Sequence, residues 1–455
     1  MSDSLEGESS QSSGAPAEVR IRSSAWVFAS QVGKTALSIP VGILFARVLH
    51  ADGKGMVTVV QTTAALTVAL LNLGMPSAVM WLAAKGKATG RSSILLGGVF
   101  AALALLVGGT AAAVVGPQVV AHRLGLSSGL LFSLALVAIV PSMVGYFIDS
   151  YLIGRGAIRT ISTTDVAVLA TQLVGMLSLA ALHLLTPISA ILVWLSLTTA
   201  ATLFKGAVAL RGDAGARKSV ADLWRDGRAF ALKSWLANTV TMLSLRQDML
   251  LLAALAGARE VGIYSIAVTA AELAWYVPNA LQNVATVKFA AGGDETELVE
   301  RMNRSVWPFT LAFAVCVFAV AAPLIPLVYG GVFSASVLPL LLLLPGIVAT
   351  SMSTSLSAWL TGRGHPQEPA IANGANMAIN LVANLILAPR FGAAGAALAS
   401  TISYSVGTAV IVWRFHARTG ARVLDILVPR PADLAAMFDI AKTALAARLG
   451  GKPAV

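Results

Sequence analysis

Long uncharged apolar stretches recur along the whole chain, and they leave few folds open to it. A bilayer core about 30 Å thick is crossed by roughly 20 helical residues, and twelve stretches of about this length can be marked along the 455 residues. Only 12% of the residues are charged, against about 25% in soluble globular chains, so the outward helix faces must be apolar and their solvent is lipid. We predict an all-α integral membrane protein. Its expected spans are residues 24–48, 56–83, 92–115, 129–149, 162–185, 188–209, 231–256, 262–286, 305–329, 336–360, 368–388 and 393–415.

The distribution of Lys and Arg gives these expected helices an orientation. Basic residues gather in the cytoplasmic loops of membrane proteins. With the N-terminus inside, 25 of the 32 Lys and Arg fall in inside segments, five in outside segments and two within spans. We therefore expect a multi-pass protein of the cytoplasmic (inner) membrane with both termini in the cytoplasm. The same bias accounts for the net charge of +11 without nucleic acid as a partner.

The two ends of the chain differ from its apolar body. Residues 1–22 are rich in Ser, Gly and Glu and lack the apolar core of a secretory signal, which predicts a disordered cytoplasmic tail. Residues 416–455 are expected to form a second cytoplasmic tail. Within it, the apolar spacing over 433–449 predicts an amphipathic helix on the membrane face. A loosely attached tail fits the same residues equally well.

The sequence holds no recognisable constellation for catalysis, metal binding or a cofactor. Cys316 is the single cysteine, which excludes a disulfide within the chain and a zinc site built from several cysteines. The five histidines are scattered, and most loops are too short to build a catalytic domain. We expect a non-enzymatic protein that binds no metal and no cofactor.

A short motif occurs at equivalent places in the two halves of the chain. The sequence YLIGRG at 151–156 follows the fourth expected span, and WLTGRG at 359–364 follows the tenth, 208 positions later; Gly55 and Gly262 match at an offset of 207. A duplicated six-helix unit gives two parallel lobes, because six is even, although Gly-Arg-Gly also recurs by chance. Two such lobes with a cleft between them are typical of a transporter. The expected domains are the tail 1–22, the N-terminal lobe 23–209, a cytoplasmic linker 210–230, the C-terminal lobe 231–415 and the tail 416–455.

Polar residues form a stripe on the first and on the seventh expected span. On the first span Gln31, Lys34 and Ser38 are spaced by three and four positions, which places them on one helix face. On the seventh span Asn238 and Thr241 share a face, and Asn238 lies 207 positions after Gln31. The two helices are therefore expected to be equivalent and to line a polar cleft between the lobes.

Charged residues within spans are costly and are candidates for function. Lys34 and Arg246 would favour an anionic group such as a phosphate in the cleft. Asp248 and Glu272 are candidates for coupling to H⁺ or Na⁺. The alternative is a structural ion pair, in which Lys34 or Arg246 is held by one of these two carboxylates.

The eleventh span carries an asparagine stripe with spacings of three and four. Asn376 and Asn380 of this stripe would line the cleft or bond neighbouring helices, and helix packing is favoured. Further charged residues lie near the cytoplasmic ends of spans, where long side chains reach the interface. The full asparagine stripe is Asn373, Asn376, Asn380 and Asn384, and the charged residues near the span ends are Asp149, Asp165, Lys205 and Lys288.

Three stretches carry motifs of one transporter family. Residues 361–405 hold a G-x-G turn, an Asn-rich helix, a Leu-x-Pro-x-x-Gly break and then Gly-Ala-Ala; residues 46–79 and 248–267 look like the matching segments of two lobes. Together they resemble polysaccharide flippases of the multidrug/oligosaccharidyl-lipid/polysaccharide exporter superfamily. The first-lobe segment departs from the family pattern, with His50 where Gly is usual and Met56 where an aromatic residue is usual.

The resemblance implies the flipping of a polyprenyl-pyrophosphate-linked oligosaccharide across the membrane by alternating access, for surface polysaccharide assembly. It also implies an H⁺ or Na⁺ gradient or the membrane potential as the energy source. A polysaccharide polymerase and glycosyltransferases are expected partners. Two other interpretations remain open: an ion-coupled multidrug efflux antiporter of the same superfamily, and a membrane scaffold that transports nothing.

Overall fold

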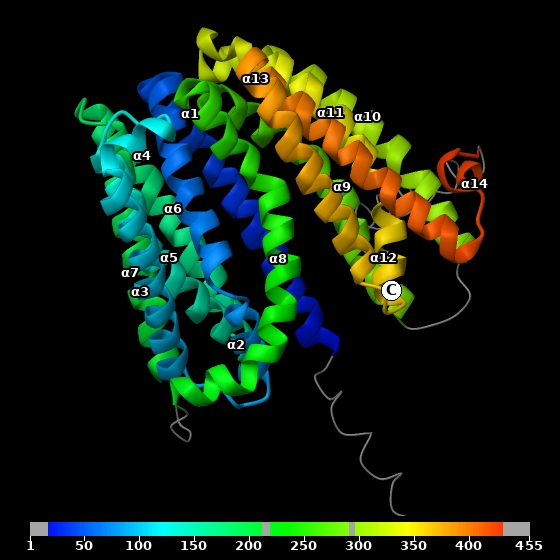
Figure 1. Ribbon diagram of the computed structural model, residues 1–455, viewed down its shortest axis with the longest axis horizontal. Coiled ribbons are helices and arrows are strands. Elements are labelled where there is room, and N and C mark those ends of the chain that lie inside the picture. Colours follow the sequence, from blue (N-terminus) through cyan, green and yellow to red (C-terminus); the bar gives the residue numbers. More distant parts are fainter. Residues whose placement is uncertain (1–16, 212–218, 291–295, 431–455) are drawn as a thin grey trace, which may run out of the picture.

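The computed structural model describes residues 17–211, 219–290 and 296–430, which form helices and no β-strand (Figure 1). Helices α1–α7 form an N-terminal lobe (N-lobe), and α8–α14 form a C-terminal lobe (C-lobe). The helices are α1 Ala17–Leu71, α2 Met75–Ala84, α3 Gly90–Val115, α4 Pro117–Arg123, α5 Gly129–Gly154, α6 Ile158–Ala181, α7 Pro187–Arg211, α8 Val220–Ala256, α9 Ala258–Ala290, α10 Thr296–Tyr329, the 3₁₀ helix η1 Gly331–Ser336, α11 Val337–Ser351, α12 Thr354–Gly362, α13 Gln367–Thr419 and α14 Val423–Leu427.

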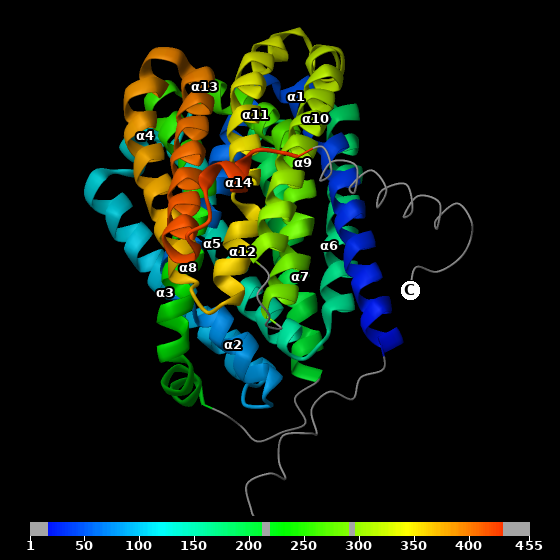
Figure 2. The ribbon, with the colours of Figure 1, turned by 90° about the vertical axis from the view of Figure 1, so that its right-hand side faces the viewer.

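Two helices are too long for one membrane crossing. α1 has 55 residues and α13 has 53, and each reverses direction within its length, so that its second half runs back along the molecule (Figures 1 and 2). Nine described segments are long and apolar enough to cross a bilayer. The two reversals add two crossings and α9 adds another. The prediction of about twelve transmembrane helices in two parallel six-helix lobes is confirmed.

The reversals occur at single residues with positive φ. His50 has φ 56° in α1, and Gly392 has φ 54° in α13. A Cβ at Gly392 would lie 2.4 Å from Oε2 of Glu260, which accepts a hydrogen bond from the N–H of Ala393 at 2.8 Å. The backbone angles at residue 392 therefore favour glycine, and the side chain of Glu260 would have to move to admit a Cβ there. We call the end of the molecule that holds both reversals the outer end, following the orientation predicted from Lys and Arg.

The repeated Gly-Arg-Gly motif builds the same turn in both lobes. It closes α5 with Gly156 at φ 77° and closes α12 with Gly364 at φ 80°. In each case the next N–H, of Ala157 or His365, donates back to a helix carbonyl at 2.8 Å. Since the two turns follow equivalent helices, the motif marks a structural repeat.

The lobes meet at the outer end in a reciprocal backbone contact between α1 and α9. A Cβ at Gly55 would lie 1.7 Å from the carbonyl oxygen of Ala258, and a Cβ at Gly262 would lie 2.1 Å from the carbonyl oxygen of Ala51. The two contacts are equivalent, because Gly262 lies 207 positions after Gly55 and Ala258 lies 207 positions after Ala51. The repeat therefore packs against its own copy, and only glycine allows the approach.

Polar contacts surround this glycine crossing. Lys54 is buried and donates a hydrogen bond to Oγ of Ser265 on α9. Nε of Arg47 donates to the carbonyl of Val328, near the end of α10, at 2.7 Å. The lobes are thus closed against one another at the outer end.

Several helix ends differ from the expected segment boundaries. α1 begins at Ala17, within the tail expected over 1–22. α8 begins at Val220, within the expected linker 210–230, because Ser219 and Asp222 form a capping box. The short helix α14 lies within the tail expected over 416–455. The amphipathic helix expected over 433–449 falls outside the described residues, and the domain boundaries stay predictions.

We expect Gly55→Ala to destabilise the closed outer end, because its methyl group overlaps the carbonyl of Ala258. Overpacking of this kind costs about 1–3 kcal/mol. Gly98→Ala is the matched control, since a Cβ there meets nothing within 4 Å. Thermal unfolding of the two variants in detergent tests the prediction, and equal midpoints would contradict it.

Candidate functional site

Four charged side chains meet inside the N-lobe. Nζ of Lys205 on α7 lies 2.7 Å from Oδ1 of Asp149 on α5 and 3.8 Å from Oδ1 of Asp165 on α6. Oδ2 of Asp165 lies 3.5 Å from Nζ of Lys34 on α1. Two ammonium and two carboxylate groups thus form a neutral chain across four helices, which we call the N-lobe charge cluster.

The N-lobe charge cluster corrects one expectation from the sequence. Lys205 was expected to extend toward the interface, but its side chain is only 7% exposed and is held by two carboxylates. A buried ammonium needs such partners, because it would otherwise lose its hydration without compensation. Lys34 pairs with Asp165 and not with Asp248 or Glu272. The side chain of Lys288 lies outside the described part of the chain.

Arg246 and Glu272 form an ion pair in the C-lobe. Their side chains lie 3.2 Å apart, on α8 and α9, and are 39% and 42% exposed. This is the pairing that the alternative interpretation anticipated. Because both groups keep access to solvent, the pair is weaker than a buried one and can exchange partners.

Asp248 lies deeper than this pair and is 5% exposed. Its Oδ2 accepts hydrogen bonds from the hydroxyl of Tyr264 at 2.6 Å and from Ser400 at 3.4 Å, and its Oδ1 accepts from the N–H of Met249 at 2.8 Å. The carboxylate is therefore satisfied by hydroxyl and backbone donors from three helices, and nearby Arg246 pairs with Glu272 instead.

In the asparagine stripe of α13, Asn380 bonds neighbouring helices and Asn376 lines a cavity. Asn380 is fully buried and accepts from Nε2 of Gln247 at 3.1 Å and from Asn384 at 3.1 Å, while it donates to Ser400 at 3.2 Å. Asn380 thus ties α8 to both halves of α13. Asn376, one helical turn earlier, lines a cavity in the C-lobe.

Asp248 and Glu272 share one small cavity. It has a volume of about 30 Å³ and is also lined by Tyr264, Trp275 and Tyr404. That volume has room for one or two water-sized groups. The two carboxylates named as coupling candidates therefore line the same small cavity.

A larger cavity of about 490 Å³ lies between the lobes, and we call it the inter-lobe cavity. Asn238 and Thr241 of the α8 stripe line it, opposite α1, α5 and α7 of the N-lobe. Asn238 also donates to Oγ of Ser77 on α2 at 3.3 Å. Among the described residues that line this cavity none is charged, so Lys34 and Arg246 lie outside its wall.

The remaining stripe residues lie apart from the inter-lobe cavity. Ser38 lines a mostly apolar cavity of about 340 Å³ where α1 meets α9 and α10, and Glu272 reaches the same cavity. The side chain of Gln31 lies outside the described part of the structure. Ser38 and Asn238 are therefore not brought together in one cavity.

Comparison with known protein families identifies the family of this chain. A family described as polysaccharide biosynthesis protein matches residues 21–280, which is more than half of the chain. The chain belongs to this family. One curated relative, the uncharacterized membrane protein YabM of Bacillus subtilis (strain 168), is 31% identical over 84 residues, which span 18% of the chain and 16% of YabM.

Solved structures share the fold of this polysaccharide biosynthesis protein at low sequence identity. Lipid II flippase MurJ in an inward closed conformation matches with a TM-score of 0.69 and 14% identity, covering 89% of both chains. A multidrug resistance MATE family transporter of the MOP superfamily, inward-facing, matches with a TM-score of 0.58 and 17% identity, covering 85% of this chain and 96% of that one. A MOP superfamily transporter from Pyrococcus furiosus Vc1 matches at 0.54 and 17%, covering 88% and 95%.

We expect Asp149→Asn to destabilise this family member, because Lys205 would keep only the more distant carboxylate of Asp165. Breaking one side of a buried pair costs about 3–5 kcal/mol, and we expect about 2 kcal/mol here because Asp165 remains. The double variant Asp149→Asn/Lys205→Met should recover most of this loss. Thermal unfolding measures both, and a double variant no more stable than Asp149→Asn would contradict the pairing.

Proposed function

We propose that the protein flips a polyprenyl-pyrophosphate-linked oligosaccharide across the cytoplasmic membrane by alternating access. The observation that carries the proposal is the inter-lobe cavity, which is lined by amide and hydroxyl side chains of both lobes. The lobes touch at both ends of the molecule: the glycine crossing of α1 and α9 closes the outer end, and at the other end a Cβ at Gly74, before α2, would lie 2.1 Å from the carbonyl oxygen of Ala231 on α8. A polar cavity between two such contacts suits alternating access, in which one contact opens while the other stays closed, and membership of the polysaccharide biosynthesis family gives the substrate class.

The ion pair between Arg246 and Glu272 supports a mechanism in which the anionic substrate displaces Glu272 from Arg246. Arg246 is 39% exposed and is held by a carboxylate that is 42% exposed. A pyrophosphate can take the place of Glu272, because it offers the planar guanidinium of Arg246 the same acceptors with more charge. The substrate would then bind where the protein already stabilises a cation, and it would release a carboxylate on doing so.

Glu272 and Asp248 then become the groups that couple transport to an ion gradient. They face one small cavity, so an H⁺ or Na⁺ taken up there neutralises charge close to Arg246. An inward H⁺ or Na⁺ gradient drives outward flipping only by exchange, because the ion must move opposite to the substrate. These carboxylates would therefore take up the cation at the outer face once the pyrophosphate has left, and would release it to the cytoplasm as Glu272 pairs with Arg246 again.

The remaining parts of the proposal follow from the substrate class. Both termini face the cytoplasm, as the Lys and Arg distribution predicts. Glycosyltransferases supply the lipid-linked sugar on that side, and a polysaccharide polymerase consumes it on the other. The mostly apolar cavity between α1, α9 and α10 gives the polyprenyl chain contact with the bilayer while its head group crosses.

An efflux antiporter for organic cations is the second candidate. The observation that favours it is the pair of carboxylates beside Trp275 and Tyr404 in one cavity, a combination that can bind an aromatic cation. The volume of this cavity, about 30 Å³, is far too small for a drug as it stands. The flippase is therefore the better-supported function.

Deletion of the gene tests the two functions against each other. A flippase predicts less surface polysaccharide and an accumulation of lipid-linked oligosaccharide on the cytoplasmic face. Both are measured by sugar analysis and by accessibility to an added glycosidase. Unchanged surface polysaccharide together with greater sensitivity to cationic drugs would favour the antiporter instead.

The exchange mechanism predicts opposite effects for the two members of the C-lobe ion pair. Arg246→Gln should weaken binding of polyprenyl pyrophosphate about tenfold, because a charge-assisted bond contributes about 1.5–3 kcal/mol. Glu272→Gln should strengthen it, because the competing carboxylate is gone. Arg225→Gln, which removes an exposed cation paired with Asp222, is the matched control. A Glu272→Gln variant that binds more weakly than the wild type would refute the exchange.

A further inference from the structure

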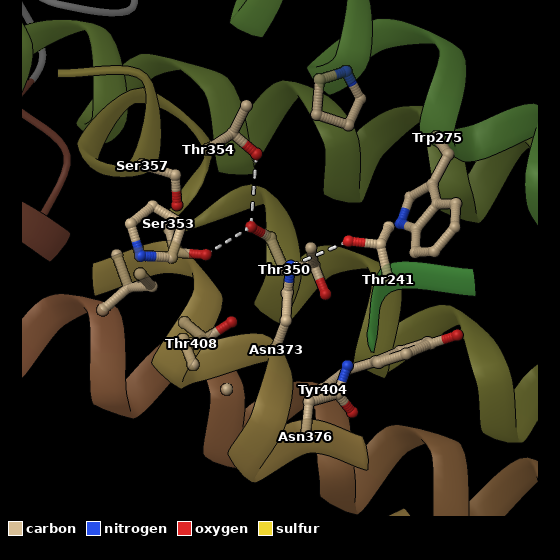
Figure 3. Close-up of a pocket in the computed structure, with 15 residues that line it drawn as sticks. Thr241, Trp275, Thr350, Ser353, Thr354, Ser357, Asn373, Asn376, Tyr404 and Thr408 are labelled. Atoms are coloured by element: carbon tan, nitrogen blue, oxygen red, sulfur yellow. Dashed lines mark hydrogen bonds between the residues drawn. The ribbon is translucent and has the colours of Figure 1, made fainter. Parts of the chain in front are cut away.

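A second polar cavity lies inside the C-lobe, beside the inter-lobe cavity. It has a volume of about 290 Å³ and is enclosed by α8, α9, α11, α12 and α13 (Figure 3). We call it the C-lobe cavity. Thr241 lines both this cavity and the inter-lobe cavity, so the two adjoin at α8. The proposed function assigns no ligand to the C-lobe cavity.

Seven of the fifteen residues that line the C-lobe cavity carry a hydroxyl group. Among the described residues that line it none is charged. The hydroxyls of Thr350, Ser353, Thr354 and Thr408 donate to helix carbonyls, so their oxygens are left to accept hydrogen bonds from a ligand that carries donors. The aliphatic hydroxyl residues of the wall are Thr241, Thr350, Ser353, Thr354, Ser357 and Thr408.

A break in a membrane-crossing helix supplies part of this wall. α11 ends at Ser351 and α12 begins at Thr354, and the N–H groups of Met352 and Ser353 donate to carbonyls three residues earlier, as in a 3₁₀ turn. The carbonyl of Met352 accepts a hydrogen bond from Asn303 on α10 at 2.6 Å. Irregular backbone at membrane depth is tolerated where it lines a polar cavity. The break therefore marks a site and is itself stabilised by a neighbouring helix.

Two further residues of the wall hold polar atoms without a partner. Asn376 is 9% exposed, and its Oδ1 is buried without a hydrogen bond. Nε1 of Trp275 is likewise buried without one. A buried acceptor and a buried donor left unpaired are costly unless a ligand or water satisfies them. Both point to an occupant that offers a donor and an acceptor.

An aromatic pair completes the C-lobe cavity. The rings of Trp275 and Tyr404 lie 5.7 Å apart at 42° and separate this cavity from the small acidic cavity of Asp248 and Glu272, which they also line (Figure 3). Aromatic faces pack well against C–H groups. A ligand of this cavity therefore combines an apolar face with several hydroxyl or amide groups.

We infer that the C-lobe cavity binds an uncharged sugar of the lipid-linked oligosaccharide, an inference that rests on the proposed function. A phosphate would find no cation in the described wall, and a lipid tail would leave the buried Oδ1 of Asn376 and Nε1 of Trp275 unpaired. A sugar offers equatorial hydroxyls to the broken helix and a C–H face to Trp275 and Tyr404. The pyrophosphate stays near Arg246, and the sugar enters beside Thr241.

Binding of two lipids to the full chain in detergent, followed by native mass spectrometry, tests the inference. The probes are polyprenyl pyrophosphate carrying a neutral trisaccharide and the same lipid without sugar. We expect the wild type to prefer the sugar-bearing lipid about tenfold, which corresponds to one or two net hydrogen bonds. The variant Ser353→Ala/Thr354→Val should lose this preference and keep its affinity for the bare lipid.

Two further variants keep the result interpretable. Ser351→Ala/Thr310→Val is the matched control, because it also removes two hydroxyls bonded to helix carbonyls, and neither residue lines the cavity. This control should keep the full preference. Asn376→Ala should reduce the preference on its own, which covers the case in which the double variant does not fold.

The outcomes separate the sugar site from the proposed function. If the wild type binds both lipids equally, or if Ser353→Ala/Thr354→Val and Asn376→Ala keep the preference, the sugar site is overturned while the flippase stands. If the wild type binds neither lipid, the proposed function falls and the sugar site falls with it. Loss of the preference in the cavity variants but not in the control supports the sugar site.

Discussion

The lack of water within the bilayer is the constraint on which the rest of this structure depends. Polar groups at that depth must be satisfied by the protein, since lipid offers no hydrogen bonds. The N-lobe charge cluster, the Arg246–Glu272 pair and the hydroxyl donors around Asp248 are three solutions to the same problem. They differ in depth, and the Arg246–Glu272 pair is the most exposed of the three. Function is therefore expected where polar groups in the membrane lack a full set of hydrogen-bond or ion-pair partners within the protein.

The two lobes use polar groups differently, although they derive from one repeat. The N-lobe joins its charges into a neutral, partly buried chain that fixes α1, α5, α6 and α7 to one another. The C-lobe has ion pairs of its own, such as Glu368 with Arg414 and Arg418, and in addition it contains a broken helix and two adjoining cavities. The C-lobe is therefore the lobe expected to respond to a ligand as the two lobes rock about the central cavity.

Much of the fold could be predicted from the sequence, because the bilayer makes local patterns decisive. Span length gave the twelve helices, and the Gly-Arg-Gly turns and the pair Gly55 and Gly262 gave the repeat. The expected spans leave gaps at 49–55 and 389–392, and the structure reverses in each gap at one residue with positive φ, His50 and Gly392. Backbone reversals depend on close contacts such as Gly392 with Glu260, which sequence spacing does not reveal.

The site was predicted less well, because its contacts join distant parts of the chain. Asn238 and Thr241 do line the inter-lobe cavity, but the partner of Lys34 is Asp165, a residue judged by its nearness to a helix end. The C-lobe cavity was missed altogether. The polar run SMSTSLS over 351–357, within an otherwise apolar stretch, was a signal that could have found it.

The glycine crossing at the outer end has a consequence for how the molecule can move. Its two halves are copies of one another, so separating Gly55 from Ala258 also separates Gly262 from Ala51. Backbone packing this close loses a quarter to a half of its attraction when the gap widens by about 0.5–1 Å. The two contacts are therefore expected to part together and not one after the other.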